Sequence, residues 1–218
     1  MEIAAKEKID VLLVDDHAVV REGYRRLLER HGDIVVVGEA DNAATAYELF
    51  CGLDPQIVIM DIALPGISGI EAMRRMLVYK PSTRVLIFSM HEETIFAKRA
   101  LQAGAFGYVT KASAPTILVE AVHSIVRGQK YLSAEIAQKL ALADFSGDQV
   151  VAEGLSAREF EVLRLLVQGQ SIRDIAQSMG LNPKTVANHQ SVIKQKLGAD
   201  TALQLLKAAG KLGLEPQN

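Results

Sequence analysis

Five strand-like segments alternate with five helix-like segments before Gly128, and this alternation constrains the fold more than any other feature. The strand-like segments are short, mostly apolar and rich in β-branched residues, as expected for strands that are buried on both faces. They cover residues 9–14, 34–37, 57–60, 85–88 and 107–109. Amphipathic segments follow them at residues 18–30, 43–53, 70–79, 94–103 and 116–126. Because parallel strands need crossovers of about this length, the pattern predicts an α/β fold with a five-stranded, doubly wound parallel sheet.

The alternation of strand-like and helix-like segments ends after Gly128. Residues 133–143 predict one further helix with Ser133 as its N-cap, and residues 144–154 are polar and rich in turn formers, which indicates a linker. From Leu155 onward the sequence predicts a small all-α domain, with helices at residues 156–168, 171–179, 183–197 and 201–209. The expected organisation is therefore an α/β domain over residues 8–128, a helix and linker over 129–154, and a four-helix domain over 155–218.

Composition and charge bear on the cellular compartment and on the kind of partner. The single cysteine, Cys51, cannot form an internal disulfide, which fits a reducing compartment. The N-terminus is polar, and no apolar run approaches the ~18 residues of a membrane span, so we expect a cytoplasmic protein without a membrane partner. Residues 1–149 hold 16 Lys and Arg against 20 Asp and Glu, whereas residues 150–218 hold 8 against 6. The mildly basic tail is compatible with nucleic acid but does not demonstrate it.

Polar residues follow four of the five predicted strands. Asp15 and Asp16 follow the first strand, Asp61 the third, Ser89 the fourth and Lys111 the fifth. Each is ordinary alone, since an aspartate after a strand is often a cap or a turn residue. Because the carboxyl ends of parallel strands share one edge of the sheet, we expect the five side chains to converge.

Such a cluster has a definite chemistry. Three carboxylates repel one another, and a hard divalent cation such as Mg²⁺ relieves this repulsion by taking oxygen ligands. With the metal present, Asp61 can act as a nucleophile toward a phosphoryl group and form an acyl phosphate. The metal and the Lys111 ammonium would neutralise charge on the transferring oxygens, and Ser89 could donate a hydrogen bond to the product.

Residues 9–128 resemble the receiver domain of response regulators. The matching motifs are LLVDDH (12–17), VIMDIALPGISGIEAMR (58–74), LIFSMH (86–91) and LQAGAFGYVTKAS (101–113). The resemblance implies that a partner histidine kinase phosphorylates Asp61, and that the domain catalyses only this transfer and its own slow dephosphorylation, so that the protein is no enzyme in the usual sense. It also implies these roles: Asp16 and Asp61 as direct Mg²⁺ ligands, Asp15 as a ligand through water, Ala63 as a ligand through its carbonyl, Lys111 as the lysine of the site, Ser89 as the switch hydroxyl, and Tyr108 as the aromatic that swings inward on activation. For Tyr108, a core aromatic with its hydroxyl at the surface remains the alternative.

Residues 171–196 read as helix, tight turn, helix. Gly180 provides the turn, and Asn182 with Pro183 opens the second helix as N-cap and first residue. Val186 and Ile193 mark the inner face of that helix. A free face bearing Lys, Asn and Ser suits a DNA major groove, because amides and hydroxyls reach base edges and lysines reach phosphates. An ordinary polar bundle surface is the alternative.

Residues 155–199 resemble the LuxR-type DNA-binding domain across its length, through LSAREFEVLRLLVQGQSIRDIAQSMGLNPKTVANHQSVIKQKLGA. Together with the receiver this is the architecture of the NarL/FixJ class. The resemblance implies a transcription regulator that binds a two-fold site on double-stranded DNA as a homodimer. DNA contacts are expected from Lys184, Thr185, Ala187, Asn188, Ser191, Lys194 and Lys196, although Ala187 stands where many relatives carry a DNA-contacting lysine. His189 and Gln190 could be structural or base-reading. Leu203 and Leu206 are the expected dimerisation residues, but a plain core helix fits nearly as well.

Three rival functions remain open. A phosphatase or phosphotransferase would use Asp61 on outside substrates. A small-molecule sensor with the same tail would not need the acidic cluster. A constitutive regulator would ignore phosphorylation, because a complete pocket shows competence rather than use.

Overall fold

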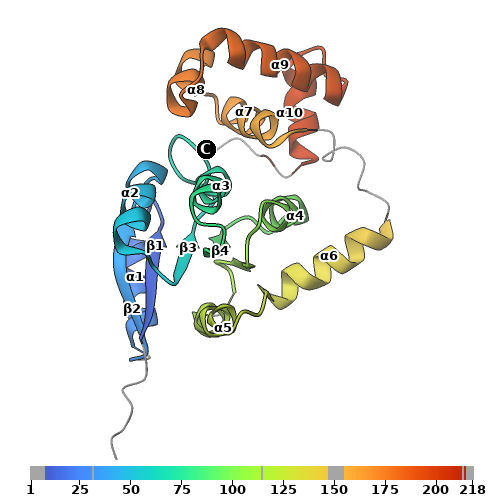
Figure 1. Cartoon of the computed structure of the whole chain (residues 1–218). Coiled ribbons are helices and arrows are strands. Elements are labelled where there is room, and N and C mark those ends of the chain that lie inside the picture. Colours follow the sequence, from blue (N-terminus) through green and yellow to red (C-terminus); the bar gives the residue numbers. More distant parts are fainter. Residues whose placement is uncertain (1–7, 31, 114, 147–154, 213, 215–218) are drawn as a thin grey trace, which may run out of the picture. The chain divides into compact units, whose positions relative to one another are not determined.

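The fold was examined in a computed structural model, which describes residues 8–30, 32–113, 115–146, 155–212 and 214. The chain divides into two compact units: residues 1–92 and 97–137 form an α/β unit, and residues 93–96 and 138–218 form a helical unit. Figure 1 shows the elements of both units. None of the described helices is long and apolar enough to cross a membrane.

The α/β unit is built on one parallel sheet in the order β2-β1-β3-β4-β5-β6. Its strands are β1 (Ile9–Val14), β2 (Ile34–Ala40), β3 (Ile57–Met60), β4 (Arg84–Ser89), β5 (Gly107–Thr110) and β6 (Tyr131–Leu132). Its helices are α1 (Ala18–Glu29), α2 (Ala43–Leu53), α3 (Gly69–Tyr79), α4 (Thr94–Gln102) and α5 (Pro115–Val126). All five predicted strand–helix repeats are present, and the predicted doubly wound parallel sheet is confirmed.

The prediction of five strands was wrong by one, because β6 was missed. This strand pairs with β5 over two residues, and the pairing is flanked by hydrogen bonds from Tyr131 N to Phe106 O and from Ser133 N to Tyr108 O. Two residues are too few to show a period-2 pattern, so only the proximity of the β5 edge makes this segment a strand.

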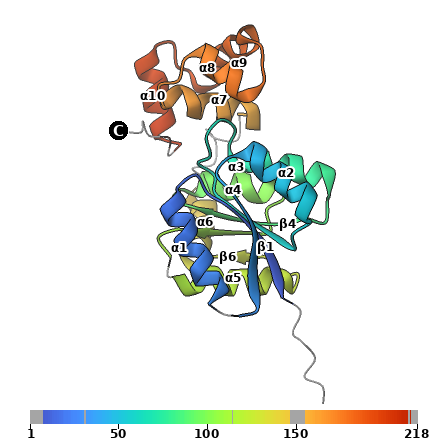
Figure 2. The ribbon, with the colours of Figure 1, turned by 90° about the vertical axis from the view of Figure 1, so that its left-hand side faces the viewer.

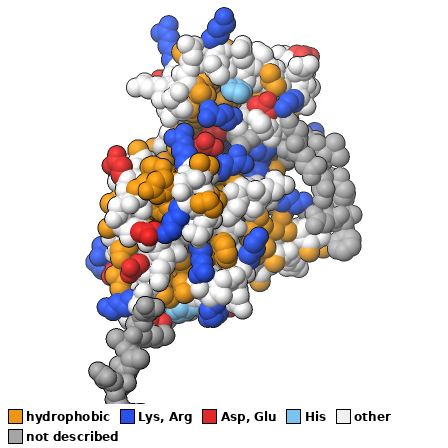
Figure 3. All heavy atoms as spheres, viewed as in Figure 1, with side chains coloured by type: hydrophobic (Ala, Val, Ile, Leu, Met, Phe, Trp, Pro, Cys, Tyr) orange, Lys and Arg blue, Asp and Glu red, His pale blue; other side chains and the backbone are white. Residues whose placement is uncertain are grey.

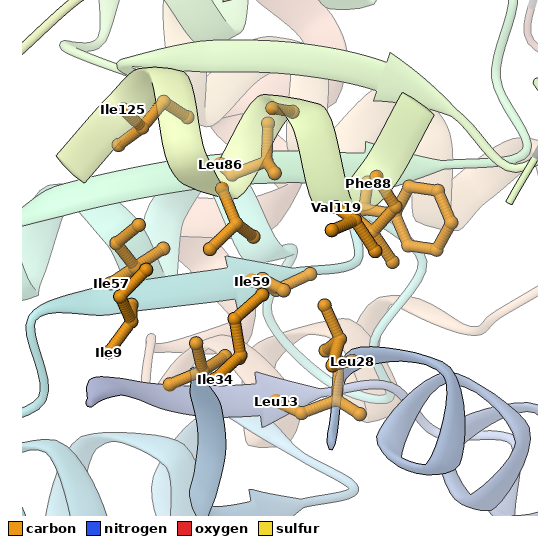
Figure 4. Close-up of a cluster of buried hydrophobic side chains, with 14 of the residues drawn as sticks. Ile9, Leu13, Leu28, Ile34, Ile57, Ile59, Leu86, Phe88, Val119 and Ile125 are labelled. Atoms are coloured by element: carbon orange, nitrogen blue, oxygen red, sulfur yellow. The ribbon is translucent and has the colours of Figure 1, made fainter. Parts of the chain in front are cut away.

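The helices cover the sheet on both faces. Alternate residues of β1, β3 and β4 point toward α1 and α5, where Leu13, Ile59 and Leu86 pack with Leu28 and Ile125 (Figure 4). Helices α2, α3 and α4 lie on the opposite face, as Figure 2 shows. The near-continuous apolar runs of the strands are explained by this two-sided burial.

An aromatic cluster joins α2 to α3. The ring of Tyr79 lies 6.3 Å from that of Tyr47 and 6.2 Å from that of Phe50, both in edge-on geometry. Hydrophobic side chains gather over this part of the surface in Figure 3. Leu53 on α2 and Val78 on α3 are also exposed. The Phe50 ring is buried whereas Tyr79 is 63% exposed, so the contact between these two helices extends from the core to the surface.

After β6 comes α6 (Ala134–Ser146), and its start agrees with Ser133 as the predicted N-cap. The helix runs three residues further than predicted, to Ser146, and the rest of the predicted linker, residues 147–154, lies outside the described residues.

The helical unit contains the four predicted helices, α7 (Ala157–Val167), α8 (Ile172–Met179), α9 (Pro183–Leu197) and α10 (Ala202–Gly210). Ser156 and Ser171 form capping boxes with Glu159 and Asp174. The αL conformation of Gly180, the predicted turn residue, ends α8, and that of Gly198 ends α9. Helix α9 packs against both α7 and α8, and its position in the helical unit is thereby set.

Candidate functional site

Backbone hydrogen bonds just past the strand ends align the carboxyl ends of five strands, β1 to β5. Asp15 N donates to Ala40 O (3.0 Å), Asp61 N donates to Val14 O (2.9 Å), and Lys111 N donates to Ser89 O (2.8 Å). These bonds continue the parallel ladder one residue past the strands. The side chains that follow β1, β3 and β5 therefore emerge at one edge of the sheet, as the strand-end pattern predicted.

Lys111 bridges two buried carboxylates. Its Nζ lies 2.5 Å from Asp15 Oδ2 and 2.6 Å from Asp61 Oδ2, and the three side chains are at most 5% exposed. Burial alone would lower the pKa of the Lys111 ammonium, but the Asp61 charge and the hydrogen bonds to both carboxylates outweigh it and raise the pKa. The lysine therefore stays charged and offsets part of the repulsion between the acids.

The second carboxylate oxygen of Asp61 is also held. Ala63 N donates a hydrogen bond of 3.3 Å to Asp61 Oδ1, while Lys111 occupies Oδ2. Both oxygens thus have a donor, and the backbone of residue 63 lies beside the carboxylate. This is the position from which the carbonyl of Ala63 was predicted to reach a metal.

Asp16 and His17 form the open side of the cluster. Asp16 exposes 32% of its side chain, and its Oδ1 lies 2.7 Å from His17 Nδ1. The ligand atoms of Asp15, Asp16 and His17 all lie within 4.8 Å of one another. Asp15 and Asp16 supply hard oxygen donors of the kind that Mg²⁺ takes, and Asp61 is joined to Asp15 through the Lys111 ammonium, so the residues fit such an ion.

Glycine is required at residue 69, which sequence reasoning did not single out. A Cβ at this position would lie 1.8 Å from the Asp61 carbonyl oxygen. Gly69 N donates to Ile62 O at 3.0 Å, so the start of α3 is drawn against the loop after Asp61. The signal was present in the motif as a glycine at the start of a helix, but its meaning depends on this tertiary approach.

Arg21 on α1 also holds the cluster and was missed by the sequence analysis. Its Nη1 donates to the backbone oxygen of Asp15 (2.6 Å), and its Nε pairs with Glu39 on β2 (3.1 Å). Arg25 pairs with the same carboxylate at 2.6 Å. The loop that presents both Asp15 and Asp16 is thereby tied to α1 and β2.

Ser89 and Tyr108 are both fully buried. The Ser89 Oγ accepts a hydrogen bond from His91 N (3.3 Å), and the Tyr108 hydroxyl donates to His91 O (2.8 Å). The tyrosine ring lies inside the fold with its hydroxyl bonded to the loop that follows Ser89. The alternative of a hydroxyl at the surface does not match this arrangement, and the two predicted switch residues are joined through one loop.

The outer face of α9 is polar. Val186 and Ile193 are fully buried, whereas Lys184, Asn188, Ser191 and Gln195 are exposed and follow one another at helical spacing. Thr185, Ala187 and Lys194 are intermediate and flank this face. Gln195 lies in the middle of the face and was missed by the sequence analysis, although its spacing from Ser191 could have identified it.

Lys196 has a partner within the fold. Its Nζ lies 2.7 Å from Glu159 Oε2, and Glu159 also caps α7 through Ser156 N. Burial would raise the pKa of Glu159, but the hydrogen bonds from Lys196 and Ser156 lower it below its usual value. This ion pair ties the end of α9 to the start of α7.

Helix α10 has two apolar faces. Leu205 and Ala209 are buried, whereas Leu203 is 63% and Leu206 42% exposed. The helix therefore contributes to the core through one face, and the two predicted dimerisation residues lie on the other.

Comparison with known proteins identifies both units. Residues 11–123 match the family model described as response regulator receiver domain, and residues 153–209 match that of the luxR family of bacterial regulatory proteins. The chain is 35% identical to the response regulator UvrY of Escherichia coli K12 over 208 residues, which cover 94% of this chain and 95% of that protein. The chain belongs to the NarL/FixJ class of response regulators.

Other relatives agree with this assignment. The regulator is 36% identical over 208 residues to the response regulator GacA of Pseudomonas aeruginosa, covering 94% of this chain and 97% of that protein. Among solved structures, RcsB of Salmonella enterica serovar Typhimurium, bound to promoter rprA in the presence of phosphomimetic BeF₃⁻, matches with a TM-score of 0.76. It is 25% identical, with 94% of this chain and 99% of that chain covered. A LuxR-family response regulator from Aurantimonas sp. SI85-9A1 is 46% identical with a TM-score of 0.63, covering 64% of this chain and 100% of that chain.

The resemblance found in the sequence is thus confirmed, and so is the fold of receiver followed by helix-turn-helix. The regulator belongs to a family of transcription regulators rather than of classical enzymes. Its acidic cluster lies in the receiver, and the polar face of α9 lies in the DNA-binding unit.

Proposed function

We propose that a partner sensor histidine kinase phosphorylates Asp61 and that this phosphorylation controls dimerisation and sequence-specific DNA binding by α9. The observation that carries the proposal is the buried Asp61 carboxylate, with Lys111 on one oxygen and the Ala63 amide on the other. An acyl phosphate formed there would carry new negative charge into a site that already presents a buried cation. Domain limits of 8–128 for the receiver, 129–154 for helix and linker, and 155–218 for the DNA-binding domain complete the proposal.

The phosphoryl transfer is a displacement at phosphorus. An Asp61 carboxylate oxygen forms the new O–P bond while the P–N bond to the kinase histidine breaks, and the electron pair leaves with the imidazole. Lys111 then moves its ammonium from the carboxylate to a phosphoryl oxygen, where it offsets charge. Attack by water on the acyl phosphate returns the aspartate and inorganic phosphate. The receiver acts only on itself in both reactions.

The residues present fit Mg²⁺, which supplies charge neutralisation of the phosphoryl oxygens when it is bound. In this proposal Asp16, Asp61 and the carbonyl of Ala63 hold the ion directly, and Asp15 acts through water. The open position of Asp16 supports a direct ligand role, whereas the ammonium of Lys111 already occupies Asp15 Oδ2.

The switch is proposed to run through Ser89 and Tyr108. The Ser89 hydroxyl donates a hydrogen bond to the phosphoryl oxygen, which draws the following loop inward, and the Tyr108 hydroxyl is bonded to that loop through His91 O. Phosphate then stabilises whichever of two receiver states binds it more tightly. The buried ring of Tyr108 supports its place in the inward state.

For DNA binding we propose contacts from Lys184, Thr185, Ala187, Asn188, Ser191, Lys194 and Lys196. The exposed positions of Asn188 and Ser191 support base reading. The exposed Lys184 and the half-buried Lys194 at the edge of this face suit phosphates. Lys196 has a smaller part, because its ammonium is paired with the Glu159 carboxylate.

Leu203 and Leu206 form the proposed dimer contact, which would place two α9 helices on a two-fold site. A solved structure of two RcsB dimers bound to two parallel DNAs supports the proposal that a dimer binds DNA. Binding to chromosomal DNA implies work in the cytoplasm.

Gel-shift titrations test the phospho-switch. The wild type and Asp61→Asn are compared with and without acetyl phosphate and Mg²⁺, on a duplex selected by the wild type. We expect acetyl phosphate to tighten binding by the wild type only, and EDTA to abolish the effect. Asp41→Asn, which changes an exposed carboxylate at the start of α2, serves as the matched control. Equal stimulation of the wild type and Asp61→Asn would refute the switch, and unchanged tight binding throughout would favour a constitutive regulator.

A further inference from the structure

An exposed valine lies on the outer surface of α9. Val192 is 37% exposed, and it is the large hydrophobic residue of this helix that meets solvent among the described residues. The bundle does not need it, because Val186 and Ile193 fill the inner face and are fully buried. Val192 therefore requires an explanation outside the core of the helical unit.

Helical geometry places Val192 beside the base-reading positions. It follows Asn188 by four residues, which turns it by only about 40° around the axis and moves it about 6 Å along the axis. It also follows Ser191 directly, and Ser191 bonds back to Ala187 O at 3.1 Å through its hydroxyl. Asn188 and Val192 thus form a neighbouring pair, one amide and one isopropyl group, on the surface that faces outward.

The chemistry of valine limits what it can recognise. An isopropyl group makes no hydrogen bond to phosphate or to base edges, and valine is a poorer helix former than alanine or lysine at an exposed site. The apolar group that a major groove offers is the C5 methyl of thymine, whereas the asparagine amide suits adenine. The spacing of about 6 Å along α9 corresponds to roughly two base-pair steps.

We infer that Val192 reads a thymine methyl in each half-site, within about two base pairs of the base bound by Asn188. This inference deepens the proposed function and rests on α9 being the helix that enters the groove. Val192 is then a specificity-determining residue, and thymine rather than cytosine is selected by contact with the methyl group.

The test separates the methyl group from every other feature of the base. A duplex site is first selected from a random library by the full-length wild type in the presence of beryllofluoride and Mg²⁺. Each thymine of one half-site is then replaced singly by deoxyuridine, which removes only the methyl. The affinities of the wild type, Val192→Ala and Val78→Ala are measured for each duplex. Val78 is an exposed valine of α3 in the receiver, so it controls for the substitution itself.

We expect one deoxyuridine substitution to weaken binding by the wild type and by Val78→Ala about fourfold, as for the loss of one buried methyl. Val192→Ala should bind the normal duplex about fourfold more weakly than the wild type for each half-site. Replacing the same thymine by deoxyuridine should not weaken its binding further. Alanine favours helix, so the variant should keep the melting temperature of the wild type. If Val192→Ala loses as much as the wild type at every deoxyuridine, or if no deoxyuridine affects the wild type, the methyl reading is overturned while DNA binding stands. If no duplex is selected, the proposed function and this inference both fail.

Discussion

Replacing Gly69 with alanine tests whether the start of α3 determines the position of the Asp61 backbone. The added Cβ would lie 1.8 Å from Asp61 O, 2.8 Å from Asp61 C and 2.9 Å from Met60 Cγ. Side-chain carbons do not approach other heavy atoms within 3.0 Å, so the helix and the carbonyl must separate by about 1.2 Å. Both atoms at closest approach belong to backbone, and no rotamer change relieves the contact.

The separation acts on the phospho-acceptor directly. Asp61 N is bonded to Val14 O and Gly69 N to Ile62 O, so a shift strains both bonds. Overpacking of a core costs about 1–3 kcal/mol and occasionally more, and we place this variant at about 3 kcal/mol because backbone must move. For a receiver of this size that lowers the melting temperature by about 10 °C. A displacement of about 1 Å at a reacting group lowers its rate by up to about a hundredfold.

Two assays measure these effects. Thermal unfolding followed by circular dichroism reports the receiver transition, and phosphate-affinity gels report the rate of Asp61 phosphorylation by acetyl phosphate below the transition. Gly23→Ala is the matched control, because a Cβ at Gly23 in the middle of α1 meets nothing within 4 Å. We expect that control to stabilise the receiver by about 0.5–1 kcal/mol. A Gly69→Ala variant that melts and is phosphorylated like the wild type would show that the close approach does not constrain the site.

Three further outcomes follow from the ion pairs. Lys111→Met leaves two buried carboxylates without their ammonium, which should cost about 3 kcal/mol and lower the receiver melting temperature in EDTA by about 10 °C. Millimolar Mg²⁺ should restore more stability to the variant than to the wild type. Equal melting temperatures in EDTA would contradict the stabilising role of these ion pairs. The pKa of Glu159 is lowered, so its contribution to stability is complete above the ordinary glutamate pKa of 4.5 and is lost as pH falls through the lower folded value. The melting temperature of the helical unit should therefore decline as pH falls below 4.5, and Glu159→Gln should flatten that decline. Parallel curves for the two proteins would argue against this role. Arg21→Gln should weaken Mg²⁺ binding, measured by calorimetry, about tenfold, because the backbone carbonyl of Asp15 loses its hydrogen-bond donor. Arg25→Ala should leave the affinity unchanged. Equal affinities of the wild type and Arg21→Gln would show that Arg21 does not support the site.

The strands and helices of the receiver were predictable because their periods are local. The apolar runs of β1 and β3 and the amphipathic α1 can be read from neighbouring residues alone. The strand β6 was not predictable in this way, since it exists only where the chain returns beside β5. Local patterns therefore recover elements with many residues and miss the short ones that neighbours impose.

The convergence of Asp15, Asp61 and Lys111 was predictable for a topological reason. Parallel strands end at the same edge, so residues nearly a hundred positions apart could be placed together without coordinates. The partners of each atom were not predictable. That Lys111 contacts Asp15 as well as Asp61, and that Arg21 holds the Asp15 carbonyl, depends on side-chain directions that the spacing of strands does not determine.

Helix α9 shows what this limit means for function. Its lysines appear equivalent in the sequence, yet Lys196 is bound to Glu159, which is 37 residues earlier in the chain. Because Ala187 contributes no charge, α9 would in the proposed function rely mainly on Lys184 and Lys194 for phosphate contact. Fewer lysine–phosphate contacts release fewer counterions from the DNA, so the affinity should depend less steeply on salt concentration. In the proposed function, a recognition helix with so little charge would obtain its discrimination from Asn188, Ser191 and apolar contact, because hydrogen bonds and methyl contacts distinguish bases whereas lysine–phosphate pairs do not.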